Sequence, residues 1–308
     1  MTKIFIDGSA GTTGLRIYER IAERRDVEWI RLTEENRKDP AARADAINQA
    51  DVAFLCLPDA AAIEAVAMVQ NPNTAIIDTS TAHRTSEGWT YGFPEVHNLR
   101  AQIRNSKRIA NPGCHASGFV ALVAPLTENG ILSPNATLSC FSLTGYSGGG
   151  KKMIAEYESE EGDPLLAAPR MYGLTQQHKH LKEMGAICGL TSAPLFCPIV
   201  APYYSGMEVT VPLSRETLTV SSEELKTLYR DYYGKGGLVR YTDEQEAGFL
   251  SAAAYAGRDD MQVTVCGNDD RILLVARFDN LGKGASGSAI QNMNILLGVD
   301  EATGLNLA

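Results

Sequence analysis

Apolar residues in the first third of the chain form short continuous runs, separated by segments whose apolar residues recur with helical spacing. Runs of about four to eight apolar residues between turn signals are typical of parallel strands buried on both faces. We therefore expect strands at residues 3–7, 28–32, 51–57, 74–78 and 107–110, with helices between them at 41–49, at 60–70 and up to about residue 25. The alternation of strands and helices predicts a doubly wound parallel sheet of the Rossmann type.

The pattern changes after residue 126, where apolar and polar residues alternate with period two. Alternation predicts half-buried strands of an antiparallel sheet, and it occurs at residues 137–144, 208–213, 261–266 and 271–278. Helices are expected at residues 115–126, 153–160, 222–233 and 288–297. We predict an α/β protein with a Rossmann-type dinucleotide-binding domain at 1–114, which a C-terminal helix at about 285–308 joins, and an α+β domain with a mixed or antiparallel sheet at 115–284.

Composition narrows the class of protein. The chain has 308 residues with 44% hydrophobic content, enough for two cores. Its net charge of −9 argues against nucleic acid or an anionic membrane surface as a partner. We expect a cytoplasmic protein, because the six cysteines are scattered without a C-x-x-C pair, no signal region is visible at the start, and no apolar run approaches the roughly 18 residues that span a bilayer.

A glycine-rich turn follows the first predicted strand and opens a helix. Glycines at a spacing of three let the backbone approach a pyrophosphate, whose charge meets N–H groups at the helix start. The alternative is a plain tight turn. The candidate cofactor-binding residues of this turn are Gly8, Ser9, Ala10, Gly11, Thr12, Thr13 and Gly14.

Other candidate cofactor residues lie at strand ends and near the C-terminus. Glu34 and Glu35 follow the second strand, but the adjacent Arg37 and Lys38 suit a 2′-phosphate and favour NADP(H) over NAD(H). A solvated charged loop is the alternative. We add the strand-end residues Leu57, Pro58 and Ser80, and Asn280, Gly282 and Gly284 from a glycine-rich loop whose following helix is expected to close the cofactor site.

The turn Asn111-Pro112-Gly113 delivers Cys114 to the start of an apolar helix. Unpaired N–H groups and the helix dipole stabilise a thiolate there, which favours a nucleophile, although a buried structural cysteine is the alternative. The acid-base partner is expected from His178 or His180. We rank His115 below this pair because neighbouring side chains on a helix diverge, and two histidines without a third ligand argue against a metal site.

Substrate-binding residues are expected at three places. Arg84 follows the fourth strand and could bind a substrate anion, or it could form a surface salt bridge. Asn111 opens the turn before the cysteine. A glycine-rich loop that precedes Lys151 and Lys152 could present N–H groups to an anion, or could be a flexible surface loop, and it contributes Ser147, Gly148 and Gly149.

Four motifs together carry a resemblance: G-S-A-G-T-T-G, N-P-G-C, Q-H-K-H and D-N-L-G-K-G-A-S-G-S-A-I-Q-N-M-N. Over essentially the whole chain, the set resembles the short (type 2) form of N-acetyl-gamma-glutamyl-phosphate reductase, a relative of aspartate-semialdehyde dehydrogenase with a glyceraldehyde-phosphate-dehydrogenase-like architecture. Longer family members usually have Pro before the Glu of the histidine motif, and this chain has Lys182 there.

The resemblance implies NADPH-dependent reduction of an acyl phosphate to an aldehyde through a Cys114 thioester, in arginine biosynthesis. It matches His178 and His180 to the acid-base motif, and it suggests a homo-oligomer, a dimer or a tetramer. Two alternatives remain. One is another acyl-phosphate reductase, such as aspartate-semialdehyde dehydrogenase or the aminoadipate-pathway reductase. The other is a non-catalytic dinucleotide sensor.

Overall fold

The structure is a computed structural model that describes residues 1–9, 11–234 and 236–307. It divides into two compact units. The first comprises Met1–Pro94, Asn98–Pro112 and Ala285–Leu305. The second comprises Glu95–His97, Gly113–Gly284 and the last residues from Asn306.

The first unit contains a parallel sheet with strand order β2-β1-β3-β4-β6-β5. Its strands are β1 (Thr2–Asp7), β2 (Val27–Ile30), β3 (Val52–Leu55), β4 (Ala75–Asp78), β5 (Thr90–Tyr91) and β6 (Arg108–Ala110). Every residue of β3 and β4 is buried, as the continuous apolar runs predict. The predicted Rossmann-type sheet is therefore confirmed. The two-residue strand β5 was not predicted, because it is too short to show a pattern.

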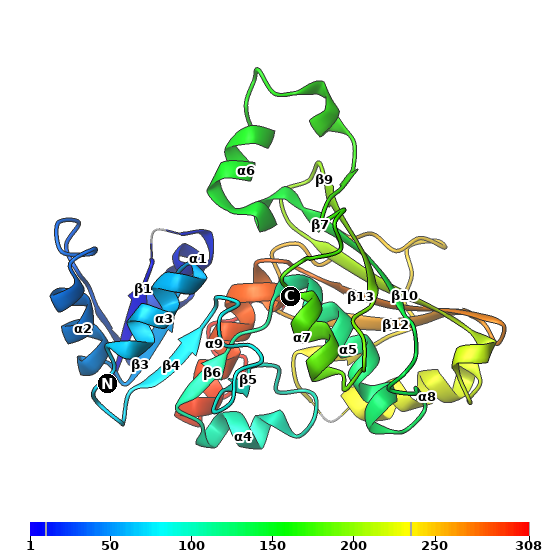
Figure 1. The fold of residues 1–308 in the computed structure, drawn as a ribbon, viewed down its shortest axis with the longest axis horizontal. Helices are drawn as coiled ribbons and strands as arrows, with labels where there is room; N and C mark the ends of the chain where they lie inside the picture. The colour runs from blue at the N-terminus through cyan, green and yellow to red at the C-terminus, as the bar shows by residue number, and fades with distance from the viewer. Residues whose placement is uncertain (10, 235, 308) are drawn as a thin grey trace. The chain divides into compact units, whose positions relative to one another are not determined.

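Helices flank this sheet, and the last of them comes from the C-terminal part of the chain. They are α1 (Thr12–Ala22), α2 (Pro40–Gln49), α3 (Asp59–Ala67), α4 (Leu99–Asn105) and α9 (Gly287–Leu297). The N-terminus of α2 is stabilised by Asp39, whose carboxylate accepts the N–H of Ala42 at 2.8 Å. The C-terminal helix α9 packs against α1, α4 and β4, and Figure 1 shows it beside β6.

The second unit is built on a mixed sheet with strand order β11-β12-β13-β10-β7-β9-β8. The four expected strands are present as β7 (Ser139–Gly145), β10 (Met207–Ser214), β12 (Met261–Asn268) and β13 (Arg271–Phe278). Three further strands were not predicted: β8 (Arg170–Met171), β9 (Leu195–Ala201) and β11 (Val239–Tyr241). The run of β9 contains Pro198, which argues against a strand in sequence reasoning, yet β9 pairs in parallel with β7.

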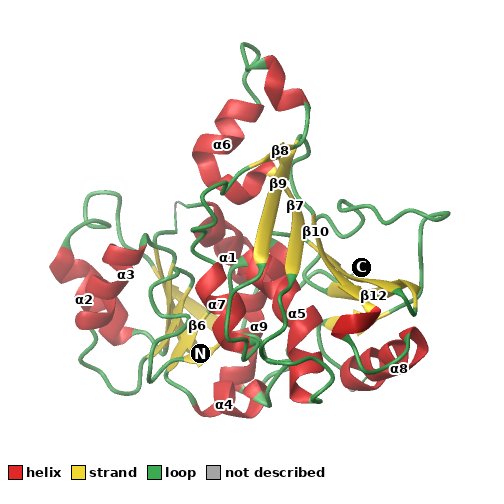
Figure 2. Cartoon of the chain, turned by 45° about the vertical axis from the view of Figure 1, so that its right-hand side comes forward, coloured by secondary structure: helices red, strands yellow, loops and turns green. Residues whose placement is uncertain are grey.

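The helices α5 (Cys114–Glu128) and α8 (Ser222–Tyr233) pack against this sheet, and α7 (Leu181–Ile187) packs against α5 (Figure 2). α5 is buried from His115 to Leu126 and contacts β10 and β13. Its burial agrees with its apolar sequence. On α8, the hydroxyls of Tyr229 and Tyr233 donate to carbonyl oxygens of α5, which ties the two helices together.

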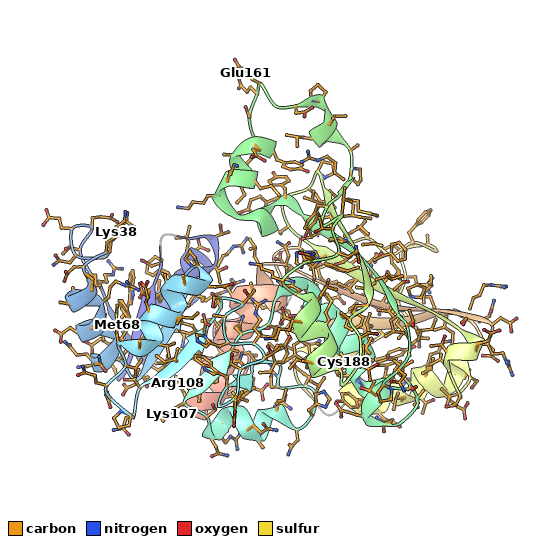
Figure 3. The ribbon with its side chains drawn as sticks, viewed as in Figure 1. Lys38, Met68, Lys107, Arg108, Glu161 and Cys188 are labelled. Atoms are coloured by element: carbon orange, nitrogen blue, oxygen red, sulfur yellow. The ribbon has the colours of Figure 1, made fainter. Side chains whose placement is uncertain are left out.

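A segment between β7 and β9 projects beyond the ends of these strands (Figures 1 and 2). It contains η1 (Tyr146–Gly149), α6 (Gly150–Tyr157) and η2 (Pro164–Ala167), with Glu161 at its tip (Figure 3). The expectation of a glycine-rich loop followed by a helix at 153–160 was wrong in position. Ser147, Gly148 and Gly149 form a 3-10 turn that leads directly into α6. Similarly, Gly282–Ser286 forms a π-helical turn before α9.

None of the helices in the described part of the chain is long and apolar enough to cross a membrane.

Candidate active site

Cys114 is the first residue of α5, and the preceding Gly113 is the helix N-cap. The Ser117 N–H and hydroxyl both donate to the Gly113 carbonyl, at 2.8 and 3.1 Å, and close the first turn. Gly284 lies against the thiol residue, because a Cβ added to Gly284 would come within 3.0 Å of Cys114 Cβ. A side chain at this position would force its neighbours to shift, so the predicted loop residue Gly284 favours the close approach of the 282–286 turn to Cys114.

The three imidazoles of His115, His178 and His180 lie in one cluster of the second unit. The ring of His115 is 5.6 Å from that of His178 and 5.5 Å from that of His180, and the latter two rings are 4.7 Å apart. Phe196 adds an apolar wall, 5.3 Å from the His115 ring. The structure therefore places the predicted pair, His178 and His180, beside His115, which directly follows Cys114 on α5.

His115 is locked in place and electrically neutral. Its Nδ1 is 2.7 Å from the Ser142 hydroxyl and its Nε2 is 2.6 Å from the Tyr172 hydroxyl. Burial, with a smaller contribution from nearby His178, lowers the pKa of His115 to about 3. A side chain with both nitrogens engaged and such a low pKa is unsuited to act as the general base, which agrees with its lower rank in the sequence.

Glu183 connects the histidine segment to the head of α5. This carboxylate is 1% exposed, its Oε2 accepts the N–H of Gly113 at 3.2 Å, and its Oε1 lies 4.0 Å from His180 Nε2. The residue was not among the predicted site residues. The signal that could have found it is its position three residues after His180, which places both side chains on one face of a helical turn.

Asn280 and Ser147 are joined, although they lie far apart in the sequence. Asn280 Nδ2 donates to Ser147 Oγ at 3.0 Å, and its Oδ1 accepts the Gly206 N–H at 3.0 Å. The N–H of Gly282 donates to the buried carboxylate of Asp279, also at 3.0 Å. These contacts fix the turn before α9 against η1 within the second unit, so the candidate substrate and cofactor residues of this unit share one network.

Arg84 and Asn111 are both buried in the first unit and bind main-chain groups. The guanidinium of Arg84 donates to the carbonyls of Asn111 and Thr79, at 2.9 and 3.1 Å. The side chain of Asn111 donates to the Ala285 carbonyl at 2.9 Å. Arg84 is 8% exposed, so it does not lie on the surface as the salt-bridge alternative assumed. Its role in binding a substrate anion stays a prediction.

The glycine-rich turn opens onto a cavity of about 480 Å³ at the carboxyl ends of β1, β2 and β3. Gly8 has a left-handed φ of +85°, and a Cβ there would lie 2.3 Å from the Cys56 carbonyl oxygen, so the turn requires glycine. Ser9 and Leu57 also line the cavity. Ala10 lies outside the described residues.

The remaining predicted residues of the first unit lie around these strand ends. Thr12, Thr13 and Gly14 form the first turn of α1, after Gly11, whose N–H donates to the Gly8 carbonyl at 3.0 Å. Pro58 precedes α3 as its N-cap residue. The hydroxyl of Ser80 donates to Asp78 at 2.7 Å.

The cavity wall carries more positive than negative side chains in a chain that is acidic as a whole. Arg37 and Lys38 lie on the loop after β2, where Figure 3 labels Lys38. Arg37 forms an ion pair with Glu34 at 2.6 Å. Sequence reasoning missed two more cavity arginines: Arg43, which binds Asp7 at 2.9 Å, and Arg31, which stacks 3.9 Å from the Trp29 ring centre.

Known proteins match almost the whole chain. Residues 3–106 match the model of the semialdehyde dehydrogenase NAD-binding domain, and residues 114–280 match that of the semialdehyde dehydrogenase dimerisation domain. N-acetyl-gamma-glutamyl-phosphate reductase 2 from Nostoc sp. is 46% identical over 98% of this chain and 99% of its own length. The corresponding reductase from Burkholderia lata is 44% identical over 96% of each chain.

The chain belongs to the N-acetyl-gamma-glutamyl-phosphate reductase family.

Membership in this reductase family makes the protein an oxidoreductase with an NAD(P)-binding domain and a dimerisation domain. The resemblance drawn from the four motifs is thereby confirmed. Solved structures of a neighbouring family share the fold. Aspartate semialdehyde dehydrogenase II from Vibrio cholerae, complexed with ASA, gives a TM-score of 0.72 at 17% identity, covering 96% of this chain and 98% of that one. The Candida albicans enzyme with NADP gives 0.67 at 14% identity, with coverage of 96% and 98%.

Proposed function

We propose that this reductase converts N-acetyl-gamma-glutamyl phosphate to N-acetyl-glutamate semialdehyde with NADPH, releasing phosphate, as a step of arginine biosynthesis. The names of relatives that match over nearly their full length support this substrate. The observation that carries the chemistry is the position of Cys114 as the first residue of α5, where the preceding Gly113 is held by Glu183 and Glu183 faces His180.

In the proposed reaction, the Cys114 thiolate attacks the acyl carbonyl carbon. The carbon–oxygen bond to phosphate breaks, phosphate leaves with the electron pair, and a thioester remains. Backbone N–H groups in the first turn of α5 are suited to stabilise the negative charge that develops on the carbonyl oxygen. The helix N-terminus also favours the thiolate over the thiol before attack.

The nicotinamide cofactor would supply a hydride to the thioester carbon when bound. The carbonyl oxygen takes a proton from the His180 imidazolium, which holds the proton released by the Cys114 thiol, and a thiohemiacetal forms on Cys114. His180 then removes the hydroxyl proton, the aldehyde forms, and the carbon–sulfur bond breaks to return the Cys114 thiolate. Glu183 supports this role because its carboxylate stabilises the imidazolium that proton removal creates. In this proposal His178 completes the ring cluster around His180.

The first unit, including the C-terminal helix α9, is proposed to bind the cofactor, and the second unit is proposed to carry catalysis and assembly. The glycine turn at Gly8 is proposed to bind the pyrophosphate, and the cavity of about 480 Å³ beside it is proposed to bind the adenosine. NADP(H) is favoured over NAD(H) because cationic side chains outnumber carboxylates on the cavity wall. Asn280, Gly282 and Gly284 are proposed to line the nicotinamide end.

The substrate phosphate and carboxylate are proposed to bind near Ser147, Gly148 and Gly149. Asn111 and Arg84 are proposed to contribute to substrate binding, and their side chains also hold main-chain carbonyls at the strand ends of the first unit. A match to a dimerisation domain over residues 114–280 supports a homo-oligomer, either a dimer or a tetramer. We further propose a cytoplasmic location, consistent with six free cysteines.

The experiment follows phosphate-dependent reduction of NADP⁺ with N-acetyl-glutamate semialdehyde, and with aspartate semialdehyde as the competing substrate. Cys114→Ser is expected to abolish turnover and thioester trapping. His180→Asn is expected to lose about 10²–10⁴-fold in kcat, and His178→Asn less. Near-wild-type turnover by Cys114→Ser would refute the thioester route, and a preference for aspartate semialdehyde would assign the alternative reductase activity.

A further inference from the structure

Arg170 lies on β8, next to the projecting segment, and the proposed reaction does not use it. Its Nη2 donates to the Tyr157 hydroxyl at 3.1 Å, and the guanidinium carbon lies 5.5 Å from the centre of the Tyr157 ring. The Nε atom is buried and has no hydrogen-bond partner among the described residues. No carboxylate in the described part of the chain forms an ion pair with this half-buried guanidinium. A cation with an unused buried donor is suited to bind an anionic ligand.

The strand register decides the face to which the Arg170 side chain points. Arg170 pairs with Val200 of β9. The N–H of Tyr172 donates to the Pro198 carbonyl at 3.0 Å, so the strand pairing continues through Tyr172. Side chains two residues apart on a strand point to the same face of the sheet. Because the Tyr172 hydroxyl lies 2.6 Å from His115 Nε2, Arg170 points to the face that carries the histidine cluster.

The register also places Arg170 at the level of the strand end that leads into the turn η1. Val200 pairs with Arg170 on one side and with Thr144 of β7 on the other, so these residues lie at one level across the sheet. A Cβ added to Gly148 of η1 would come within 3.4 Å of Thr144 Oγ1. The guanidinium and the candidate substrate-binding turn therefore belong to the same end of the sheet.

Two stacked tyrosines connect the guanidinium to this turn. Tyr157 on α6 binds Arg170, and its ring stacks on that of Tyr146 with 4.8 Å between the ring centres and an angle of 11° between the planes. Tyr146 is the first residue of η1 and directly precedes Ser147. The cation–π contact and the hydrogen bond hold the guanidinium in one orientation, which lowers the entropy cost of binding a ligand.

Of the two anionic groups of the proposed substrate, the carboxylate suits this position. The phosphate is attached to the carbon that Cys114 attacks, whereas the carboxylate lies at the other end of the carbon chain. Arg170 is displaced by two residues, or about 7 Å of strand, from Tyr172, which contacts the residue after Cys114. A planar guanidinium binds a carboxylate through two parallel N–H···O hydrogen bonds.

We propose that Arg170 binds the carboxylate of the substrate and makes the enzyme specific for aldehydes that carry this group. Tyr157 is a positioning residue that orients the guanidinium. The inference rests on the proposed function, since the substrate is the one proposed there. It adds the residue that distinguishes this substrate from an uncharged aldehyde of the same shape.

The test follows phosphate-dependent reduction of NADP⁺ with two aldehydes: N-acetyl-glutamate semialdehyde and 4-acetamidobutanal, which is the same molecule without the carboxylate. Arg170→Met is expected to lower kcat/KM for the first aldehyde by about 10–100-fold, mainly through KM, because a charge-assisted hydrogen-bonded pair is lost. It is expected to leave kcat/KM for 4-acetamidobutanal unchanged, because the deleted contact is absent there. Arg170→Lys is expected to recover part of the loss, since it keeps the charge without the planar fork.

Two further variants and one ligand complete the design. Arg240→Met changes an exposed arginine of β11, at the opposite edge of the same sheet, and is expected to affect neither aldehyde. Tyr157→Phe removes the hydroxyl that binds Arg170 and is expected to raise KM for N-acetyl-glutamate semialdehyde less than Arg170→Met does. N-acetylnorvaline, which has the carboxylate but no aldehyde, reports binding without chemistry, and its inhibition constant is expected to rise about 10–100-fold in Arg170→Met.

The outcomes separate the inference from the proposed function. Equal losses on both aldehydes in a folded Arg170→Met, or no loss on either, would overturn the inference, and circular dichroism establishes that the variant is folded. A raised KM for phosphate with an unchanged KM for the aldehyde would also overturn it, in favour of phosphate as the ligand. These results leave the proposed function intact. A wild-type enzyme that turns over neither aldehyde would refute the proposed function, and the inference with it.

Discussion

Among single residues, Glu183 links the histidine segment to the nucleophile, because its carboxylate contacts both His180 and the Gly113 N–H that precedes Cys114. A carboxylate that is 1% exposed needs partners to offset the loss of hydration, and the Gly113 N–H and the His180 imidazole supply them. The same two contacts place an imidazole beside the turn that presents Cys114. Glu183 thus holds the proposed base, His180, in a fixed position relative to the N-terminus of α5.

We expect Glu183→Gln to lower kcat by about 10²-fold, with a smaller change in KM, because the amide oxygen can still accept the Gly113 N–H but no longer carries charge towards His180. Steady-state kinetics at several pH values check this result. Lys182→Ala, on the exposed side of the same turn, is the matched control. Equal activity in the two variants would exclude a role for the carboxylate charge.

At the element scale, α5 is anchored at both ends by side chains from other segments. At its C-terminal end, Glu128 forms an ion pair with His97 Nδ1 at 3.0 Å, and His97 Nε2 contacts the Ile187 carbonyl at 2.7 Å. The hydrogen bond to Glu128 raises the pKa of His97 above 6.5 against the opposing effect of burial. The short segment Glu95–His97 is thereby attached to the helix core of the second unit.

This pair predicts a pH-dependent contribution to stability. Because the folded pKa of His97 is raised, its stabilisation is fully present below pH 6.5 and disappears as pH rises through the raised pKa. We expect His97→Asn to lower the free energy of unfolding by less than about 1 kcal/mol at pH 6 and by less again at pH 9, as measured by urea unfolding. Asparagine suits the left-handed φ of 52° at this position.

Glu128→Gln breaks the same pair from the other side and is the matched variant. A loss of stability that is the same at both pH values in His97→Asn would show that the charge of the imidazole does not contribute.

At the scale of the whole molecule, the chain passes repeatedly from one compact unit to the other, and a buried ion pair lies close to two of these passages. Lys283 is 0% exposed and binds both oxygens of Glu95, at 2.8 and 3.0 Å. Glu95 is the first residue of the short segment Glu95–His97, which belongs to the second unit. Lys283 lies next to the end of the long segment Gly113–Gly284 of the same unit, shortly before α9. Both residues belong to the second unit, which therefore holds two distant parts of the chain together.

We expect Lys283→Met to destabilise the protein by about 3–5 kcal/mol, because it leaves the buried charge of Glu95 without its ammonium. Thermal or urea unfolding measures this loss. The double variant Lys283→Met with Glu95→Gln is expected to recover part of the stability, since no buried carboxylate remains. A double variant as unstable as the single one would show that the cost comes from packing and not from charge.

Elements with a local pattern could be predicted from the amino-acid sequence. They are the buried strands β3 and β4, the alternating strand β10, and the helix that begins at Cys114. Their residues carry the period, the turn signal or the apolar run that the backbone geometry requires. The glycine turn and the family resemblance were visible for the same reason, because each is a contiguous motif.

Contacts between side chains from distant segments became visible only in the folded chain. It brought Glu183 to Gly113, Asn280 to Ser147, and Ser142 and Tyr172 to His115, across separations of up to 133 residues. It also showed that Arg84 binds main-chain carbonyls and that Ser147 to Gly149 form a helical turn. No local pattern contains such contacts, because they depend on strand order and on how buried polar groups find their partners after the chain has packed.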